Sequence, residues 1–189
     1  CLPLHRIVPG FRYPQYKVRM ISILLSLLKD GFFAALAAMG FAAISNPSPR
    51  VLPWCCLAAA CGHMTRFLLM TYAGWHLTIA SFIASCVIGL ISLPMAGHIK
   101  TPAEFISFPA LLPMVPGMYA YRAVQAIVYC IQIPDEGAFM HYMYLLTYNG
   151  IIFIVTILGM VVGATLPIFA FTKYSFSVTK QTRRWNSDK

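Results

Sequence analysis

Residues 142–171 read YMYLLTYNGIIFIVTILGMVVGATLPIFAF and contain no Asp, Glu, Lys or Arg. A helix needs about 20 predominantly apolar residues to cross the hydrocarbon core of a bilayer, so this stretch is long enough to span a membrane. Apolar and polar residues do not alternate along it, which argues against a strand of a membrane barrel. The stretch therefore predicts a transmembrane helix from about Tyr142 to Phe171.

The composition of the whole chain agrees with this prediction. The chain has 189 residues, of which 59% are hydrophobic and 10% are charged, and its mean hydropathy is +0.72. Soluble domains carry about a quarter of their residues as charged side chains, because they need them to build a surface that faces water. The composition therefore excludes a soluble enzyme, a disordered chain and a nucleic-acid-binding module, and it predicts a polytopic membrane protein.

The net charge of +9 is concentrated near the two ends of the chain. The basic residues there are Arg6, Arg12, Lys17 and Arg19 near the start, and Lys173, Lys180, Arg183, Arg184 and Lys189 near the end. Such placement is typical of segments that flank membrane spans, where Lys and Arg anchor the helix ends. The positive charge is thus assigned to the lipid bilayer rather than to a nucleic acid.

Four further apolar runs precede residues 142–171 and predict additional spans. They cover residues 21–45, 53–72, 77–97 and 105–133. We therefore predict an all-α transmembrane bundle of about five spans. Four spans plus a re-entrant fourth segment is the alternative. Small residues recur at four-residue spacing in three of the runs, which allows close packing of neighbouring helices. They are Ala34, Ala38 and Ala42, then Ser81, Ser85 and Gly89, and finally Gly159 and Gly163.

The distribution of Lys and Arg predicts the orientation. With five spans, residues 46–52 and 98–104 lie on the same side as the basic tail, and positive charge gathers on the cytoplasmic side. We therefore expect a cytoplasmic C-terminus. Residues 21–172 form the predicted transmembrane domain, and 173–189 form a basic cytoplasmic tail. Residues 1–20 are an N-terminal extension whose native status the sequence leaves open, since Met20 is a plausible initiator.

Four ionisable residues stand out inside apolar runs, where an isolated charge is costly, and the first three are Asp30, His63 and Arg66. Asp30 shares a helix face with the Ala34 and Ala38 stripe, so it points into the bundle, and it is a candidate for binding a proton or an ammonium group. Its alternative role is a pair with Lys29 near the interface. His63 lies near the middle of the second run and can relay a proton, or it is a histidine in a satisfied polar contact. Arg66 is a second carboxylate contact or a partner for Asp30, or it extends toward the loop after the span.

The fourth run is interrupted by Pro113 and by the pair Pro116-Gly117, which cannot continue a regular helix. Broken helices in membranes line cavities, and transporters use them to build substrate sites. A helix that starts at Pro116-Gly117 would direct free N–H groups at a carboxylate. A polar stripe follows the break, with Arg122 as the candidate carboxylate clamp. Its other members are Tyr119, Gln125 and Tyr129. The alternative is a structural kink with Arg122 paired to Asp30 or Glu104.

These features together resemble the threonine/serine exporter family, and most closely the small membrane subunit of its split, two-component form. The residues that carry the resemblance are Asp30, Gly62-His63, Arg66, Pro113, Pro116-Gly117 and Ala120-Tyr121. The resemblance covers residues 22–172. It implies export of threonine, serine or dicarboxylates such as succinate across a bacterial inner (plasma) membrane. It also implies a larger partner subunit of the same family.

We therefore expect a transporter subunit that exports small carboxylates, with proton exchange through Asp30 and His63. The substrate contacts are expected from Arg122, Gly117, Pro116, Tyr119, Gln125 and Arg66. No metal site, cofactor or nucleotide-binding loop is predicted, and no nucleophile–base pair indicates an enzyme. A homo-oligomer is a further alternative for the assembly. The rival function is a scaffold subunit that does not transport, in which the buried charges only fix how the helices pack.

Overall fold

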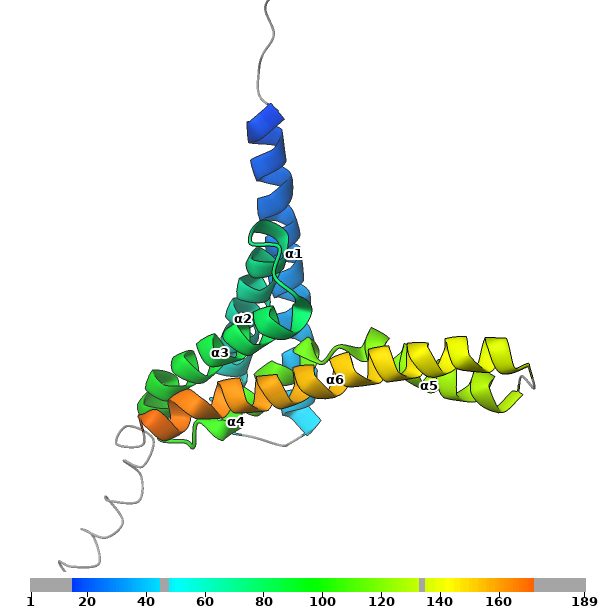
Figure 1. Ribbon diagram of the computed structural model, residues 1–189. Helices are drawn as coiled ribbons and strands as arrows, with labels where there is room; N and C mark the ends of the chain where they lie inside the picture. The colour runs from blue at the N-terminus through cyan, green and yellow to red at the C-terminus, as the bar shows by residue number, and fades with distance from the viewer. Residues whose placement is uncertain (1–14, 45–47, 133–134, 172–189) are drawn as a thin grey trace, which may run out of the picture.

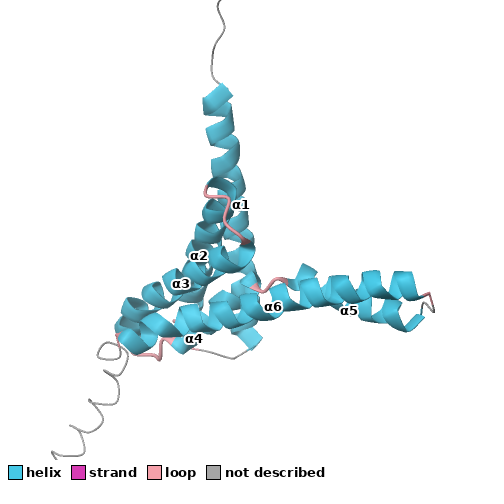
Figure 2. Ribbon diagram, viewed as in Figure 1, coloured by secondary structure: helices cyan, strands magenta, loops and turns pink. Residues whose placement is uncertain are grey.

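The computed structural model describes residues 15–44, 48–132 and 135–171, and every secondary-structure element in this part of the chain is a helix (Figures 1 and 2). The elements are α1 (Gln15–Ile44), α2 (Leu52–Tyr72), α3 (Leu77–Ile99), α4 (Glu104–Leu111), the 3₁₀ turn η1 (Leu112–Met114), α5 (Gly117–Gln132) and α6 (Glu136–Ala170). The prediction of an all-α fold is confirmed for this part of the chain. Residues 1–14 of the predicted extension and the tail 173–189 lie outside the described residues.

Three of the described helices are long and apolar enough to cross a membrane: Met20–Ile44 within α1, all of α3 and all of α6. The segment Glu104–Met114 is apolar but shorter than a span. The fourth predicted span is divided into α4, η1 and α5, as its prolines indicated. The chain is therefore a helical membrane protein with three span-length apolar helices in its described part.

Local sequence explains where α6 begins and where α3 ends. Asp135 precedes α6, and its side-chain Oδ2 accepts a hydrogen bond from the Ala138 N–H at 2.8 Å, which satisfies one of the free donors of the first turn. Lys100 ends α3 in the left-handed conformation with φ of 54°, and its N–H donates to the Ala96 carbonyl. These caps fix where the turns between helices lie.

Close approach between helix backbones holds the bundle together. A Cβ atom on Gly89 would collide with the carbonyl oxygen of Ala164, and one on Gly163 would collide with the Ser85 side chain. Glycine is thus required where α3 crosses α6. On α1, the predicted stripe of Ala34, Ala38 and Ala42 is buried, and the helix packs against α2 there. Small residues make these contacts because close packing replaces the hydrophobic driving force inside a bilayer.

Contacts between helices also establish the relative directions of α3, α4, α5 and α6. Thr78 Oγ1 lies 3.0 Å from Thr156 Oγ1, and Ser85 faces Gly163 further along both helices, so α3 and α6 run in the same direction. Helix α4 faces the C-terminal half of α6 across a small cavity, and α5 packs beside its N-terminal half. Both run opposite to α6 (Figure 1). The fourth segment therefore continues in one direction through its break, whereas the halves of a re-entrant segment would run in opposite directions.

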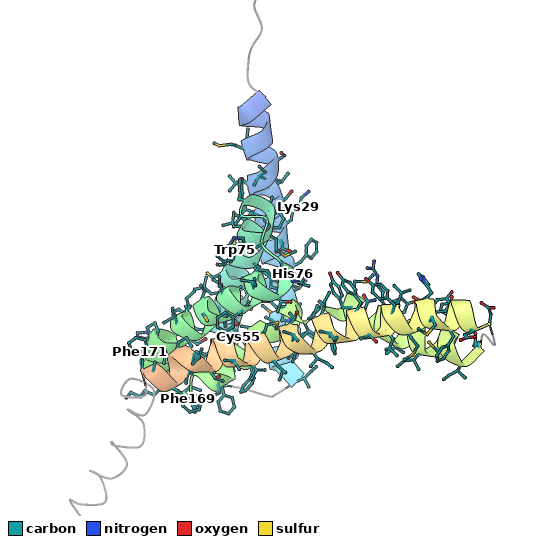
Figure 3. All side chains as sticks on the ribbon, viewed as in Figure 1. Lys29, Cys55, Trp75, His76, Phe169 and Phe171 are labelled. Carbon is teal, nitrogen blue, oxygen red and sulfur yellow. The ribbon has the colours of Figure 1, made fainter. Side chains whose placement is uncertain are left out.

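Two parts of the molecule extend from the packed centre. The N-terminal half of α1 projects beyond α2, and α5 with the N-terminal half of α6 forms a two-helix arm (Figure 1). Lys29 lies on the α1 side with Trp75 and His76 of the α2–α3 turn, whereas Phe169 and Phe171 lie at the far end of α6 (Figure 3). Between these parts, a core of buried residues surrounds η1, where Met114 and Ile88 are fully buried and contact Gly62.

Candidate functional site

Asp30 and His63 meet between α1 and α2. The Asp30 Oδ2 atom lies 3.4 Å from His63 Nδ1, and the side chains are 39% and 7% exposed, respectively. The approach of the two helices is close here, since a Cβ atom on the next residue, Gly31, would contact the end of the Met64 side chain. Asp30 thus pairs with a residue of the neighbouring helix rather than with Lys29.

Arg66 lies one turn after His63 and connects this pair to the broken fourth segment. Its Nη1 donates a hydrogen bond of 2.8 Å to the carbonyl oxygen of Met114, and its Nη2 lies 3.5 Å from His63 Nδ1. Arg66 therefore does not extend toward the loop after α2. We call Asp30, His63, Arg66 and the Met114 carbonyl the polar centre.

The Met114 carbonyl is available to Arg66 because the helix ends at this point. In a continuous helix this carbonyl would accept from the N–H four residues later. Here the chain turns at Val115, whose N–H donates to the Leu112 carbonyl at 3.2 Å, and Gly117 N–H donates to the Val115 carbonyl at 2.8 Å. Pro116 is buried next to the turn and contributes no N–H. Arg66 thus satisfies a main-chain acceptor that the break leaves free.

The imidazole of His63 has unused hydrogen-bonding capacity. Among the described residues, its buried Nε2 has no hydrogen-bond partner, although the backbone of Pro113 lies close to the ring. Its Nδ1 has two neighbours of opposite charge, the Asp30 carboxylate and the Arg66 guanidinium. One nitrogen cannot donate to the first and accept from the second at the same time. The ring is therefore placed where a change of protonation changes its partner.

A second polar region lies in the arm formed by α5 and α6. A groove of about 420 Å³ opens between the two helices. We call it the arm groove, and it is lined by Arg122, Gln125, Ala126, Tyr129, Tyr142, Leu145, Tyr148 and Asn149. The predicted stripe of Arg122, Gln125 and Tyr129 thus shares one face of α5. An exposed cation, an amide and phenol hydroxyls together can bind an anion of metabolite size.

The lining of the groove is held by contacts between and within the helices. The rings of Tyr129 and Tyr142 stack with centroids 4.8 Å apart and an interplanar angle of 23°. Asn149 is buried, and its Nδ2 donates to the Leu145 carbonyl at 2.6 Å, one turn earlier in α6. The Tyr129–Tyr142 stack thus joins α5 to α6 in one wall of the groove, and Arg122 lines the groove two turns earlier in α5.

The structure divides the predicted site residues into two groups. Asp30, His63 and Arg66 meet in the polar centre, whereas Arg122 and its stripe lie in the arm groove. Pro116 and Gly117 form the connection between them, where Pro116 is buried and Gly117 is exposed. Tyr119 is half-buried and does not line the groove. Within the part of the chain that the structure describes, Arg122 forms no ion pair with Asp30 or Glu104.

Three polar residues of the groove and one main-chain group were not anticipated from the sequence. The main-chain group is the Met114 carbonyl, which has no sequence signal. Asn149 is the only amide in the apolar stretch 142–171, and this could have marked it. Tyr142 and Tyr148 precede it in the same run, seven residues and one residue earlier. The groove could therefore have been predicted from polar residues near the start of run 142–171, which match the polar stripe of run 105–133.

Comparison with known proteins identifies the family. The family model described as "Threonine/Serine exporter, ThrE" matches residues 30–170. A protein of Haemophilus influenzae (strain ATCC 51907 / DSM 11121 / KW20 / Rd), named "Uncharacterized protein", is 37% identical over 105 residues, which are 56% of this chain and 35% of the relative. The chain thus spans about a third of that relative's length. No solved structure matches the chain. Because the family model covers most of the chain, the chain belongs to the threonine/serine exporter family.

Proposed function

We propose that this chain is a membrane subunit that exports small carboxylate metabolites, either threonine and serine or dicarboxylates such as succinate, in exchange for protons. The observation that carries the proposal is the polar centre, in which Asp30, His63 and Arg66 meet inside a membrane bundle at a broken helix. An ionisable group in the middle of a bilayer costs at least ~2.5–3.5 kcal/mol on insertion scales, so its presence there points to a function. Family membership supports transport rather than enzymatic chemistry.

The arm groove is the proposed substrate site. Arg122 is exposed in the groove and carries the positive charge that a carboxylate requires, and it can bind two carboxylate oxygens at once. The volume of about 420 Å³ is enough for a small amino acid or dicarboxylate. Gln125 and Tyr129 would supply neutral hydrogen bonds, and the N–H groups at the start of α5 near Gly117 would add a favourable dipole. We assign Arg66 to the hydrogen bond with the Met114 carbonyl at the helix break, and not to binding the substrate.

The proposed topology has five crossings, with α4, η1 and α5 as one broken span. The parallel packing of α3 and α6 supports it, because the third and fifth of five successive spans run in the same direction. In the alternative with four spans and a re-entrant segment, these two helices would run in opposite directions. With this topology we assign the C-terminus to the cytoplasmic side of a bacterial inner membrane, because Lys and Arg gather on that side.

The proposal includes a larger partner subunit of the same family. Apolar side chains are exposed along the projecting half of α1 and along α5, including Leu24, Leu25, Leu28, Tyr121 and Val124. Helix faces of this kind contact either lipid or other helices. They also suit the rival function, a scaffold subunit, so export and assembly must be measured separately.

The test is an efflux assay in cells that co-express the chain and its partner. Arg122→Ala should reduce export of serine, threonine or succinate at least about tenfold, because one lost charge-assisted hydrogen bond is worth about 1.5–3 kcal/mol. Arg50→Ala, which changes an exposed arginine of the α1–α2 loop, is the matched control and should export normally.

Assembly is measured in parallel by co-purification of the partner. Loss of export with an intact complex supports the arm groove as the substrate site. Normal export by Arg122→Ala would refute that site. Loss of assembly by Asp30→Asn with normal export by the remaining complex would favour the scaffold function.

A further inference from the structure

We propose that His63 and Arg66 form a proton-operated latch on the helix break: protonation of His63 displaces Arg66 from the Met114 carbonyl and releases α5. The inference rests on the proposed function, because it names how proton binding would be coupled to the arm groove. Its evidence is the geometry of the polar centre, which is separate from the groove.

The first step concerns the Nδ1 atom of His63. When the ring is neutral with its proton on Nε2, Nδ1 can accept from Arg66 Nη2, which lies 3.5 Å away. When the ring is protonated, Nδ1 carries a hydrogen and can only donate. Its acceptor is then the Asp30 Oδ2 atom at 3.4 Å. Protonation thus changes the hydrogen-bond partner of His63 Nδ1 from Arg66 to Asp30.

The second step concerns Arg66. A protonated imidazole next to the guanidinium is a like charge, and like charges at this separation repel strongly where water is scarce. Arg66 loses an acceptor and gains a repulsive neighbour in the same event. Its other hydrogen bond, from Nη1 to the Met114 carbonyl at 2.8 Å, must adjust when the side chain moves. The protonation state of His63 is thereby transmitted to η1.

The third step concerns the chain after η1. Met114 is followed by the Val115 turn and Pro116, and α5 begins at Gly117. No regular helical hydrogen bond connects η1 to α5 across this turn, so α5 can change its angle without breaking either helix. Because Arg122 lies in the second turn of α5, a change of this angle alters the arm groove.

The surroundings of His63 contain few other charges that could take over this role. Helix α1 supplies Asp30, with Lys29 exposed beside it, and α2 supplies Arg66. Helix α3 contains no Asp, Glu, Lys or Arg, and α4 contributes only Glu104 in its first turn. From η1 the backbone of Pro113 faces the ring. The buried Nε2 has no hydrogen-bond partner among the described residues and carries the ring hydrogen in the neutral state, so the incoming proton adds to Nδ1.

The test measures the angle of α5 directly, without substrate. Spin labels are placed at Leu57→Cys on α2 and Val124→Cys on α5, both exposed positions, after the native cysteines are replaced. The full chain with its partner is reconstituted in lipid, and the distance is recorded by pulsed electron paramagnetic resonance at pH 8 and pH 5. We expect the main distance to shift by about 1 to 5 Å, the range of helix shifts between states.

The variants define which residues carry the shift. His63→Gln should abolish it, and Arg66→Gln should give the low-pH distance at both pH values. The control His98→Gln, at the far end of α3, should behave like the parent. Equal distances at pH 8 and pH 5 in the parent, or a shift that persists in His63→Gln, would overturn the latch.

A second measurement covers the case in which the cysteine-free protein does not assemble. Hydrogen exchange of the amides of residues 115–120 is compared at one pH in the parent with its native cysteines and in Arg66→Gln. Exchange should be faster in the variant, and equal exchange would refute the latch. Both readouts are independent of Arg122. A pH-dependent shift together with normal export by Arg122→Ala would therefore refute the arm groove as the substrate site and still support the latch.

Discussion

Arg66 illustrates how far single residues could be interpreted from the sequence. Its place in an apolar run marked it as exceptional, because a buried guanidinium needs partners. The sequence could not identify them, since one partner is the main-chain carbonyl of Met114, 48 residues away. Asp30 and His63 were selected individually for the same reason. Their contact depends on the relative rotation of α1 and α2, and only the tertiary structure provides it.

At the residue scale we predict that Arg66→Ala lowers stability and that Arg66→Lys recovers part of the loss. The alanine variant leaves the Met114 carbonyl and His63 Nδ1 without the guanidinium, and the loss of a hydrogen bond from a charged group costs about 1.5–3 kcal/mol. Lysine keeps the charge but not the planar fork that reaches two partners. Thermal denaturation of the purified protein in detergent measures the difference. An alanine variant as stable as Arg50→Ala would contradict the assigned role.

At the element scale, periodicity and proline placement predicted most of the architecture. The apolar runs anticipated α2 and α3 to within a few residues, because each run ends at a proline, a glycine or a polar turn. Helix α1 begins at Gln15 rather than at the expected Ile21. The division of the fourth run followed from its prolines. The path of α5 along α6 could not be predicted, since it depends on the matching faces of two helices.

The glycines at the α3–α6 crossing provide a prediction at this scale. Gly163→Ala should destabilise the protein, because the added Cβ would collide with the Ser85 side chain and the Phe82 carbonyl. Overpacking of this kind costs about 1–3 kcal/mol. The matched control is Gly40→Ala on α1, where nothing lies within 4 Å of the added atom. The control should be neutral or slightly stabilising, because alanine favours a helix over glycine.

Denaturation by heat in detergent compares these two glycine variants. A larger loss of stability from Gly40→Ala than from Gly163→Ala would show that the two helices do not pack as described. Equal behaviour of both variants would contradict the close crossing as well.

At the scale of the whole molecule, the parallel course of α3 and α6 predicts the topology. With five crossings the turn at residues 73–76 faces outward and the loop before α2 faces the cytoplasm. A membrane-impermeant maleimide added to intact cells should therefore label Ala73→Cys and not Arg50→Cys, in a background without other cysteines. The opposite labelling pattern would support four spans with a re-entrant segment.

The central claim is that the polar centre couples proton movement to export, and Asp30 tests it most directly. Proteoliposomes that contain the chain and its partner are loaded with labelled serine, threonine or succinate, and efflux is measured with and without a pH gradient, acidic outside. We predict that the gradient accelerates efflux in the parent protein and in the control Glu136→Gln, which changes an exposed carboxylate at the start of α6. Asp30→Asn should assemble normally and lose the response to the gradient. An Asp30→Asn protein that keeps the parent's efflux rate and its full response to the gradient would contradict the claim.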